Sequence, residues 1–233
     1  MSESDALPER SGRLQHMAAN LRKLGLRGMA AKAIRDHVFR QELSFILARR
    51  TDDLPPADAT PVPDGVKLVE LTRGDAVPPL SGWLAHRCAD FAGLLEDGRI
   101  GMFALTDGQA IACIWASTED FHDPNSRLFV TVPEGEAYAF GMMVDHRYRD
   151  RSVARLLAAF GLRQMNARAV IRVFNYCDIG NETSYRAQAG IGFEETGELM
   201  VETRLFGLNL QSRRRYRGSR VPPAWNRPRL RRG

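Results

Sequence analysis

A strand-length apolar run, followed by a polar loop and an amphipathic helix, most strongly limits the fold of this chain. The run Ala137–Val144 is continuously apolar, and the loop after it is short and dense in arginine. Apolar residues then recur at helical spacing, at Val153, Leu156, Leu157 and Phe160. The first N–H groups of a helix lack partners within it, and the helix dipole adds partial positive charge there. Strand, loop and helix start together predict an anion site.

The loop and helix start resemble the acyl-CoA-binding segment of the GNAT superfamily, the Gcn5-related N-acetyltransferases. The family pattern is Q/R-x-x-G-x-G/A, and Arg149 and Ala154 match its first and last positions. Ser152 stands where the family prefers glycine, which lets the backbone approach a pyrophosphate closely. Serine keeps the N–H donor and adds a hydroxyl group.

A second segment, which ends at Phe193, resembles the family's other landmark, N-x-x-A-x-x-L-Y-x-x-x-G-F. Asn181, Gly192 and Phe193 fall in register with it. The family's tyrosine often serves as general acid, and Gln188 stands at its position. Tyr185 lies three residues earlier, on a neighbouring part of the same expected helix.

The resemblance covers roughly residues 66–208 and implies an α+β fold with a mixed, largely antiparallel sheet flanked by helices. Apolar residues at helical spacing predict an N-terminal helical extension over 14–50. Thr106-Asp107-Gly108 predicts a hairpin turn between two strands. We expect four parts: a basic amphipathic helical extension (1–50), a proline-rich linker (51–65), a GNAT-like domain (66–210) and a disordered Arg-rich tail (211–233).

The resemblance implies acetyl-CoA or another acyl-CoA as co-substrate, with no metal. Backbone N–H groups at the helix start would hold the pyrophosphate, and Arg149 or Arg151 would pair with another phosphate. Backbone groups of the preceding strand would align the pantetheine arm. A slot for the thioester would lie between this strand and the one that carries Asn175 and Tyr176. The candidate cofactor-binding residues are Met142, Met143, Val144, Arg149, Asp150, Arg151, Ser152, Val153, Ala154 and Asn181.

Two residues are catalytic candidates: Tyr185, near the position of the family's tyrosine, and Glu136, directly before the apolar strand 137–144. Tyr185 could protonate the leaving thiolate, and Glu136 could act as general base. Structural alternatives stay open for each candidate. Tyr185 could pack beneath the sheet and Glu136 could be a solvated loop acid, while Ser152 and Asn181 could be ordinary helix N-caps.

Charge is divided unevenly along the chain. The net charge of +5 combines +5 in residues 1–50 and +9 in residues 211–233, so the part between them carries −9. The basic ends could contact an anionic membrane surface or nucleic acid, and the N-terminal helices could instead pack on the domain or form a homodimer.

Two functions follow from the sequence. The first is an N-acyltransferase that moves an acyl group from acyl-CoA to an amine acceptor by direct attack on the thioester. The alternative is a catalytically weak GNAT-like scaffold, which uses its basic ends as a membrane-surface or nucleic-acid interaction module. The three cysteines are far apart, and no apolar segment follows the polar N-terminus. We therefore expect a cytoplasmic location, with peripheral membrane contact through the basic ends as an option.

Overall fold

The structure is a computed structural model that describes residue 28 and residues 39–53, 62–86, 90–123, 128–149, 152–206 and 208–217. The described residues form two compact units. The larger unit contains the described residues within 44–198 and 215–217, and the smaller unit contains residues 28, 39–43, 199–206 and 208–214. The described candidate site residues all lie in the larger unit.

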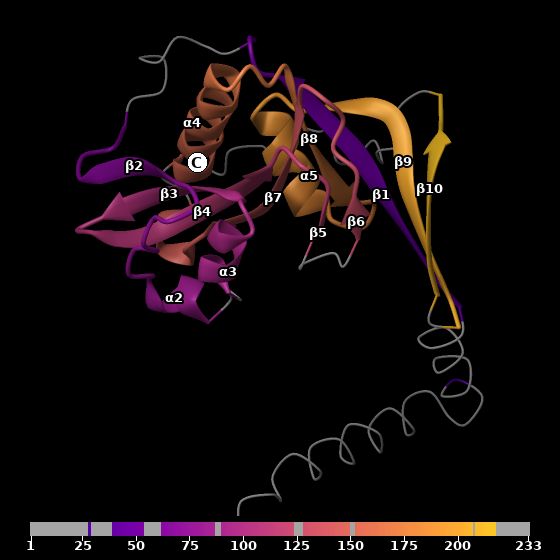
Figure 1. The fold of residues 1–233 in the computed structure, drawn as a ribbon, viewed down its shortest axis with the longest axis horizontal. Coiled ribbons are helices and arrows are strands. Elements are labelled where there is room, and N and C mark those ends of the chain that lie inside the picture. The colour runs from indigo at the N-terminus through magenta and orange to yellow at the C-terminus, as the bar shows by residue number, and fades with distance from the viewer. Residues whose placement is uncertain are drawn as a thin grey trace, which may run out of the picture. The chain divides into compact units, whose positions relative to one another are not determined.

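A mixed sheet organises the larger unit, with strand order β9-β1-β8-β7-β4-β3-β2 (Figure 1). Its β7–β8 pair is parallel, whereas β1–β8, β2–β3, β3–β4 and β4–β7 are antiparallel. This arrangement confirms the predicted α+β fold with a largely antiparallel sheet. The strands are β1 (Phe39–Arg50), β2 (Val66–Leu71), β3 (Ile100–Thr106), β4 (Gln109–Ser117), β7 (Glu136–Val144), β8 (Arg172–Asp178) and β9 (Glu194–Leu205). Strands β1 and β9 continue into the smaller unit.

Helices cover both faces of this sheet. Successive residues of a strand point to opposite faces of the sheet. The neighbours Met102 and Phe103 of β3 therefore show which helix covers each face. On one side, the Phe91 ring of α3 lies 5.7 Å from the Phe103 ring. On the other, Gly161 of α4 packs closely against Met102. The helices are α2 (Gly82–Ala85), α3 (Phe91–Glu96), α4 (Val153–Ala167) and α5 (Glu182–Gly190). The remaining elements are the 3-10 turn η3 (His146–Tyr148) and the short strands β5 (Phe121–His122) and β6 (Phe129–Val130).

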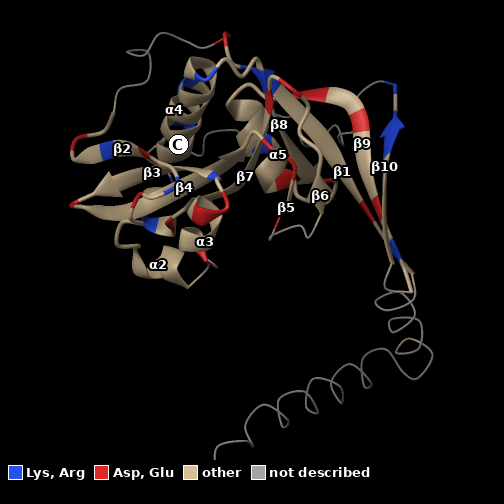
Figure 2. Cartoon of the chain, in the orientation of Figure 1, with Lys and Arg blue, Asp and Glu red and all other residues tan. Residues whose placement is uncertain are grey.

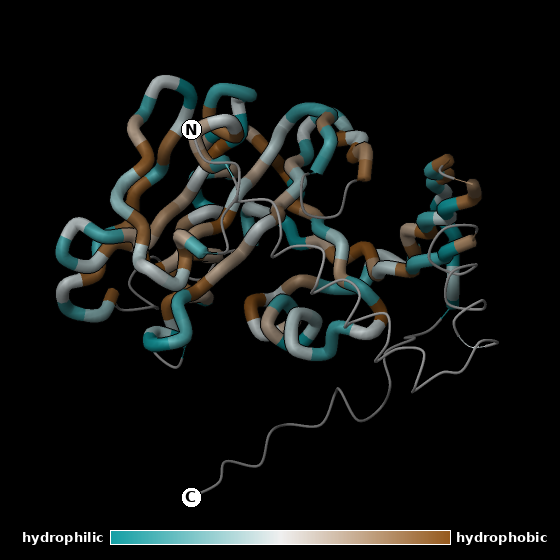
Figure 3. The backbone as a smooth tube through the Cα atoms, turned by 90° about the horizontal axis from the view of Figure 1, so that it is seen from below, coloured by the Kyte–Doolittle hydropathy of each residue, from teal (hydrophilic) through white to brown (hydrophobic). Residues whose placement is uncertain are grey.

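The β3–β4 connection has the predicted hairpin turn. Asp107 and Gly108 both have positive φ, at 51° and 75°. Positive φ at both central residues defines a type I′ turn, whose twist matches that of the flanking strands. Hydrophobic and hydrophilic stretches alternate along the backbone (Figure 3). The sequence therefore specifies this hairpin through local turn chemistry.

The predicted helix over residues 14–50 is wrong for its last part, because residues 39–50 form β1. Residues Ser44 to Leu47 are buried in succession, and β1 lies between β9 and β8. A short, continuously buried run fits a central strand as well as a helix, so periodicity alone could not separate them. Gly28 is helical, and the rest of the predicted extension lies outside the described residues.

The smaller unit contains β10 (Leu208–Arg215) up to Arg214, with the strand order β10-β9-β1. Every residue of β10 is exposed, and basic residues mark its end (Figure 2). The predicted disordered tail is therefore wrong for residues 211–215, while residues 218–233 lie outside the described residues. Within the described part of the chain, no helix combines the length and hydropathy needed to cross a membrane.

Candidate active site

Strands β7 and β8 pair with each other only near their beginnings. Their parallel register joins Glu136–Tyr138 to Arg172–Phe174, and no further β7–β8 pairing is found among the described residues. Strand β7 stays paired with β4 as far as Val144, and β8 stays paired with β1 as far as Asp178. The facing backbone edges of residues 139–144 and 175–178 are thus not joined to each other. We call these two stretches the splayed segment.

A β-bulge lies within β7 at the splayed segment. The β4–β7 register shifts between Cys113 and Trp115, so that Gly141 and Met142 oppose the single residue Ile114. Gly141 has a φ of 62°, in the left-handed region that glycine adopts without steric cost. A bulge bends its strand and increases the local twist. It therefore helps β7 to diverge from β8, immediately before the candidate residues Met143 and Val144.

The loop after β7 is anchored by the buried carboxylate of Asp145, whose side chain is 0% exposed. Asp145 accepts hydrogen bonds from the Arg147 backbone N–H at 3.0 Å and from Arg147 Nη2 at 2.8 Å. Its own N–H donates to the Ile111 carbonyl of β4 at 2.8 Å. The hydrogen bonds from Arg147 hold the pKa of Asp145 well below its usual range. The loop conformation is therefore fixed by a charged group at its base.

Arg149 is held beside the end of β7. Its Nε donates to the Val144 carbonyl at 3.3 Å, and its guanidinium carbon lies 5.1 Å from the centre of the Trp83 ring of α2. An arginine over an indole face gains cation–π attraction. Arg149 is thus positioned close to the start of α4, while Asp150 and Arg151 lie outside the described residues.

Ser152 occupies the N-cap position of α4 with left-handed backbone angles, φ 58° and ψ 10°. Its side chain makes no capping hydrogen bond, so serine does not serve here as an ordinary N-cap. The left-handed region favours glycine, which agrees with the family's preference at this position. The first hydrogen bond of the helix runs from the Leu156 N–H to the Ser152 carbonyl, at 3.0 Å. The N–H groups of Val153 and Ala154 precede it, as expected at a helix start.

Asn181 and Tyr185 have structural partners on α5. Asn181 caps this helix, since its Oδ1 accepts from the Ser184 N–H at 3.1 Å. The Tyr185 hydroxyl donates to Glu195 Oε1 at 2.9 Å, and its ring lies 5.6 Å from the Phe45 ring. Burial, together with the Glu195 carboxylate, raises the pKa of Tyr185 to about 12. These contacts direct Tyr185 toward β9 and β1.

Glu136 lies at the opposite end of β7 from the arginine-rich loop. It forms an ion pair of 2.5 Å with Arg172, its register partner on β8. The eight residue steps from Glu136 to Val144 span about 26 Å of strand. The structure therefore brings Val144 and Arg149 together and leaves Glu136 well apart from them.

The splayed segment also carries a buried polar side chain. Asn175 is 8% exposed, and its Oδ1 has no hydrogen-bond partner among the described residues. Such an atom costs free energy unless a ligand or water satisfies it. The Tyr176 ring on the opposite face lies 5.1 Å from the Tyr138 ring.

Three further residues of the site were missed from the sequence: Asp145, Trp83 and Gly141. Two of them carried a usable signal. A glycine inside a strand pattern indicates a bulge, and an aspartate directly after a strand is suited to fold its loop back. Nothing near Trp83 indicated that it would meet Arg149.

Among the described residues, the buried cysteines Cys113 and Cys177 form no disulfide. Among the described residues, no group of three or more His, Cys, Asp and Glu side chains is arranged to hold a metal ion.

Comparison with known proteins gives one family match. Residues 68–193, more than half of the chain, match the Acetyltransferase (GNAT) family. No curated protein matches the chain.

Solved structures with similar folds include a GCN5-related N-acetyltransferase from Kribbella flavida, with 14% identity, a TM-score of 0.47 and coverage of 73% of this chain and 62% of that one. A tandem GNAT protein from the clavulanic acid biosynthesis pathway has 17% identity and a TM-score of 0.49, and the match covers 78% of this chain and 59% of that one. A GCN5-related N-acetyltransferase from Sphaerobacter thermophilus has 17% identity and a TM-score of 0.44, and the match covers 78% of this chain and 58% of that one. The chain thus spans about three fifths of the length of these structures.

Proposed function

Since the chain belongs to the GNAT family of acetyltransferases, we propose that it is an N-acyltransferase that moves an acetyl or other acyl group from acyl-CoA to an amine. One observation carries this proposal. The β7–β8 ladder ends after three register pairs, and β7 then leads through an anchored loop to the left-handed Ser152 at the start of α4. An extended donor with an anionic end fits this combination of open strand edges and a helix N-terminus.

The proposed donor lies along β7 with its pyrophosphate at the start of α4. The N–H groups from Arg151 to Ala154 would hold the pyrophosphate, and Arg149 would pair with a phosphate oxygen. The backbone of Met142, Met143 and Val144 would align the pantetheine arm. The Asn181 side chain caps α5, and we propose that it also contacts the donor. Asp150, in the loop before α4, is a further proposed donor-binding residue.

The reaction is direct acyl transfer. The nitrogen of the amine attacks the thioester carbonyl, a C–N bond forms and the C–S bond breaks. The amine nitrogen gives up a proton, and the CoA thiolate leaves and takes up a proton. A backbone N–H of β7, at Met143 or Val144, would stabilise the oxyanion. Much of the acceleration would come from holding the two reactants together.

The catalytic roles of Glu136 and Tyr185 stay predictions. Each makes a structural contact, Glu136 with Arg172 and Tyr185 with Glu195. Because Tyr185 has a pKa of about 12, it keeps its proton at neutral pH. Acyl transfer by proximity does not require a fixed catalytic side chain, so activity does not depend on either assignment.

The alternative proposal, a scaffold that binds a membrane surface or nucleic acid, depends on the basic ends of the chain. Most of these residues lie outside the described part, and within it no specific observation favours the alternative over acyl transfer. A cytoplasmic location, membrane contact by the basic ends and homodimer formation likewise stay proposals.

Calorimetric titration of the full chain with CoA and acetyl-CoA tests the proposed function. We expect both ligands to bind and the variant Ser152→Glu to lose binding, because its carboxylate would repel the pyrophosphate. The matched control is Ala167→Glu, which adds the same charge at the exposed far end of α4 and should bind normally. Absence of binding by the unmodified chain at millimolar ligand would contradict the proposal.

A further inference from the structure

Asp178 is the last residue of β8 and lies in the splayed segment. The last register pair of the β7–β8 ladder is Tyr138 with Phe174. Four residue steps beyond that pair, about 13 Å, lead to Met142 on β7 and to Asp178 on β8. The β-bulge takes up one extra residue of β7, so Met143 lies at about the same level. Asp178 is therefore level with the backbone N–H groups that would stabilise the oxyanion.

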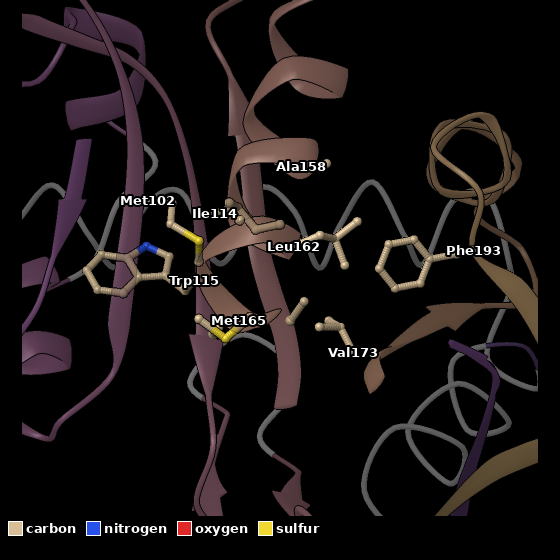
Figure 4. A pocket seen from close by; sticks show the side chains of 11 residues that line it. Met102, Ile114, Trp115, Ala158, Leu162, Met165, Val173 and Phe193 are labelled. Atoms are coloured by element: carbon tan, nitrogen blue, oxygen red, sulfur yellow. The ribbon is translucent and has the colours of Figure 1, made fainter. Parts of the chain in front are cut away.

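Asp178 points to the face of the sheet that α4 does not cover. Val173, on the same strand, lies among the apolar side chains under α4, which include Leu162 (Figure 4). Successive residues of a strand alternate between the two faces. Asp178, five residues after Val173, thus lies on the other face, together with Tyr176. A charged acceptor gains nothing from the apolar side chains under α4 and would meet Asp178 from the opposite face.

Ser44 holds the Asp178 carboxylate in place. The two residues are register partners in the antiparallel β1–β8 ladder, and the Ser44 hydroxyl donates to Asp178 Oδ1 at 2.8 Å. The Asp178 carbonyl accepts from the Asn181 N–H at 2.8 Å, in the turn that leads to α5. Ser44 is buried, whereas Asp178 is exposed. One carboxylate oxygen is thus fixed by the sheet, while the side chain stays open to an incoming molecule.

The charge of Asp178 is available to a bound cation. Among the described residues, no ion pair includes Asp178. Burial raises the pKa of Tyr138, and the charges of Asp123 and, to a smaller extent, Asp178 raise it further, so the field of Asp178 reaches β7. The half-buried Tyr176 lies two residues before Asp178 on the same face, and aromatic ring faces attract cations. A carboxylate beside such a ring favours a cationic ligand.

We infer that Asp178 binds the acceptor as an ammonium ion at the splayed segment, so that the acceptor is an aliphatic amine and not an arylamine. The inference rests on the proposed acyl-CoA-dependent function and assigns the acceptor class of that site. An aliphatic amine, with a pKa close to the value of about 10.4 for lysine, is a cation at neutral pH. The bound nitrogen would lie beside the thioester carbonyl, where proximity accelerates attack. The proton that it gives up before it attacks passes to water, because Asp178 is exposed.

Two non-reactive CoA thioethers test the inference without a known acceptor. S-(2-aminoethyl)-CoA carries an ammonium group close to the position of the attacking nitrogen, and S-propyl-CoA has the same length without the charge. Both thioethers and CoA would be titrated by calorimetry into the full chain and into its Asp178→Asn variant. We expect Asp178→Asn to lower the preference for the aminoethyl over the propyl analogue about fivefold, as for the loss of one exposed ion pair. Affinity for CoA should not change.

Asp52→Asn is the matched control, because it removes the same charge at a distant exposed site. Asp52 follows Arg50, which pairs with Arg172 at the opposite end of the β1–β8 ladder from Asp178. Its preference between the two thioethers should equal that of the unmodified chain. An equal preference in Asp178→Asn would overturn the inference and leave the proposed function intact. Failure of every ligand to bind, CoA included, would instead contradict the proposed function.

Asp178→Asn should fold, because the asparagine amide oxygen still accepts a hydrogen bond from the Ser44 hydroxyl. Thermal unfolding checks this. Asp178→Ser supplies a second variant in case it does not, since it removes the charge with a smaller side chain. A folded Asp178→Ser chain should show the same fivefold loss of preference for the aminoethyl analogue. A preference that persists in that variant would overturn the inference.

Discussion

The buried carboxylate of Asp145 is joined to the Arg147 guanidinium by two hydrogen bonds, of 2.8 Å to Nη2 and 3.2 Å to Nε. The two residues belong to the same loop, and the Arg147 side chain is 57% exposed. One edge of the Arg147 guanidinium therefore binds the buried carboxylate, and the rest of the side chain lies near solvent. The hydrogen bonds of this pair fix the conformation of the loop that follows β7.

Asp145→Asn should destabilise the chain by about 1–3 kcal/mol, because a charged acceptor of several hydrogen bonds is replaced by a neutral one. The folded-state pKa of Asp145 lies below its ordinary value of 3.8, so its stabilising contribution is fully present above that value. The contribution is lost as the pH falls from about 4 through the lower folded-state pKa. Urea denaturation between pH 3 and pH 7 should show the difference between wild type and variant shrink only at the acidic end.

The control is Asp52→Asn. Asp52 pairs with Arg50 across the same two-residue spacing, at 2.6 Å, but both side chains are exposed. Exposed pairs contribute little, so this variant should unfold much like the wild type. An Asp145→Asn variant that behaves the same way would show that the buried pair does not hold the loop.

Local patterns in the sequence predicted the elements whose stability is local. The α4 helix begins at Val153, as the apolar spacing indicated, and the Asp107-Gly108 turn closes the expected hairpin. Strand β1 could not be predicted in this way. It is paired with β8, more than a hundred residues later in the chain, and only that pairing separates a buried strand from a buried helix.

In the candidate site, too, the sequence predicted local features but not contacts between distant parts of the chain. Ser152 was identified because it departs from a family pattern, and its left-handed backbone explains why the family prefers glycine there. The partners of Tyr185 and Glu136 were not predictable, because Glu195 and Arg172 come from other strands of the sheet. Sequence spacing fixes which residues share a helix face, but it does not fix the strand that packs against that face.

Ser152→Gly should stabilise the chain by about 0.5–1 kcal/mol, because glycine adopts a φ of 58° without the steric cost that a side chain brings. Ser152→Val should destabilise it by more than about 1 kcal/mol, since branching at Cβ is poorly tolerated at positive φ. Thermal unfolding of the two variants measures both effects.

Arg155→Gly serves as the opposite control. Arg155 is exposed in the first turns of α4, where right-handed helical geometry makes glycine unfavourable by up to about 1 kcal/mol. If Ser152→Gly were as destabilising as Arg155→Gly, the left-handed conformation of Ser152 would be disproved.

Tyr185→Phe should lower stability by about 1 kcal/mol through loss of the hydrogen bond to Glu195, while turnover with an amine acceptor stays within about threefold. The reason is that its contacts point toward β9 and β1. The raised pKa of Tyr185, about 12, also predicts that its contribution to stability is present below pH 10 and lost as the pH rises toward 12. A fall in kcat of a hundredfold with unchanged KM for acyl-CoA would instead identify Tyr185 as the general acid.

Asn175→Leu should separate ligand recognition from folding. The Asn175 side chain is buried in the splayed segment, and its Oδ1 has no hydrogen-bond partner among the described residues. An apolar side chain of similar shape removes an uncompensated buried acceptor, so stability should be unchanged or higher by about 1 kcal/mol. If Oδ1 accepts a hydrogen bond from the bound donor, affinity for CoA should fall about tenfold in calorimetry. A variant that loses stability while it binds CoA normally would show that Asn175 serves the fold alone.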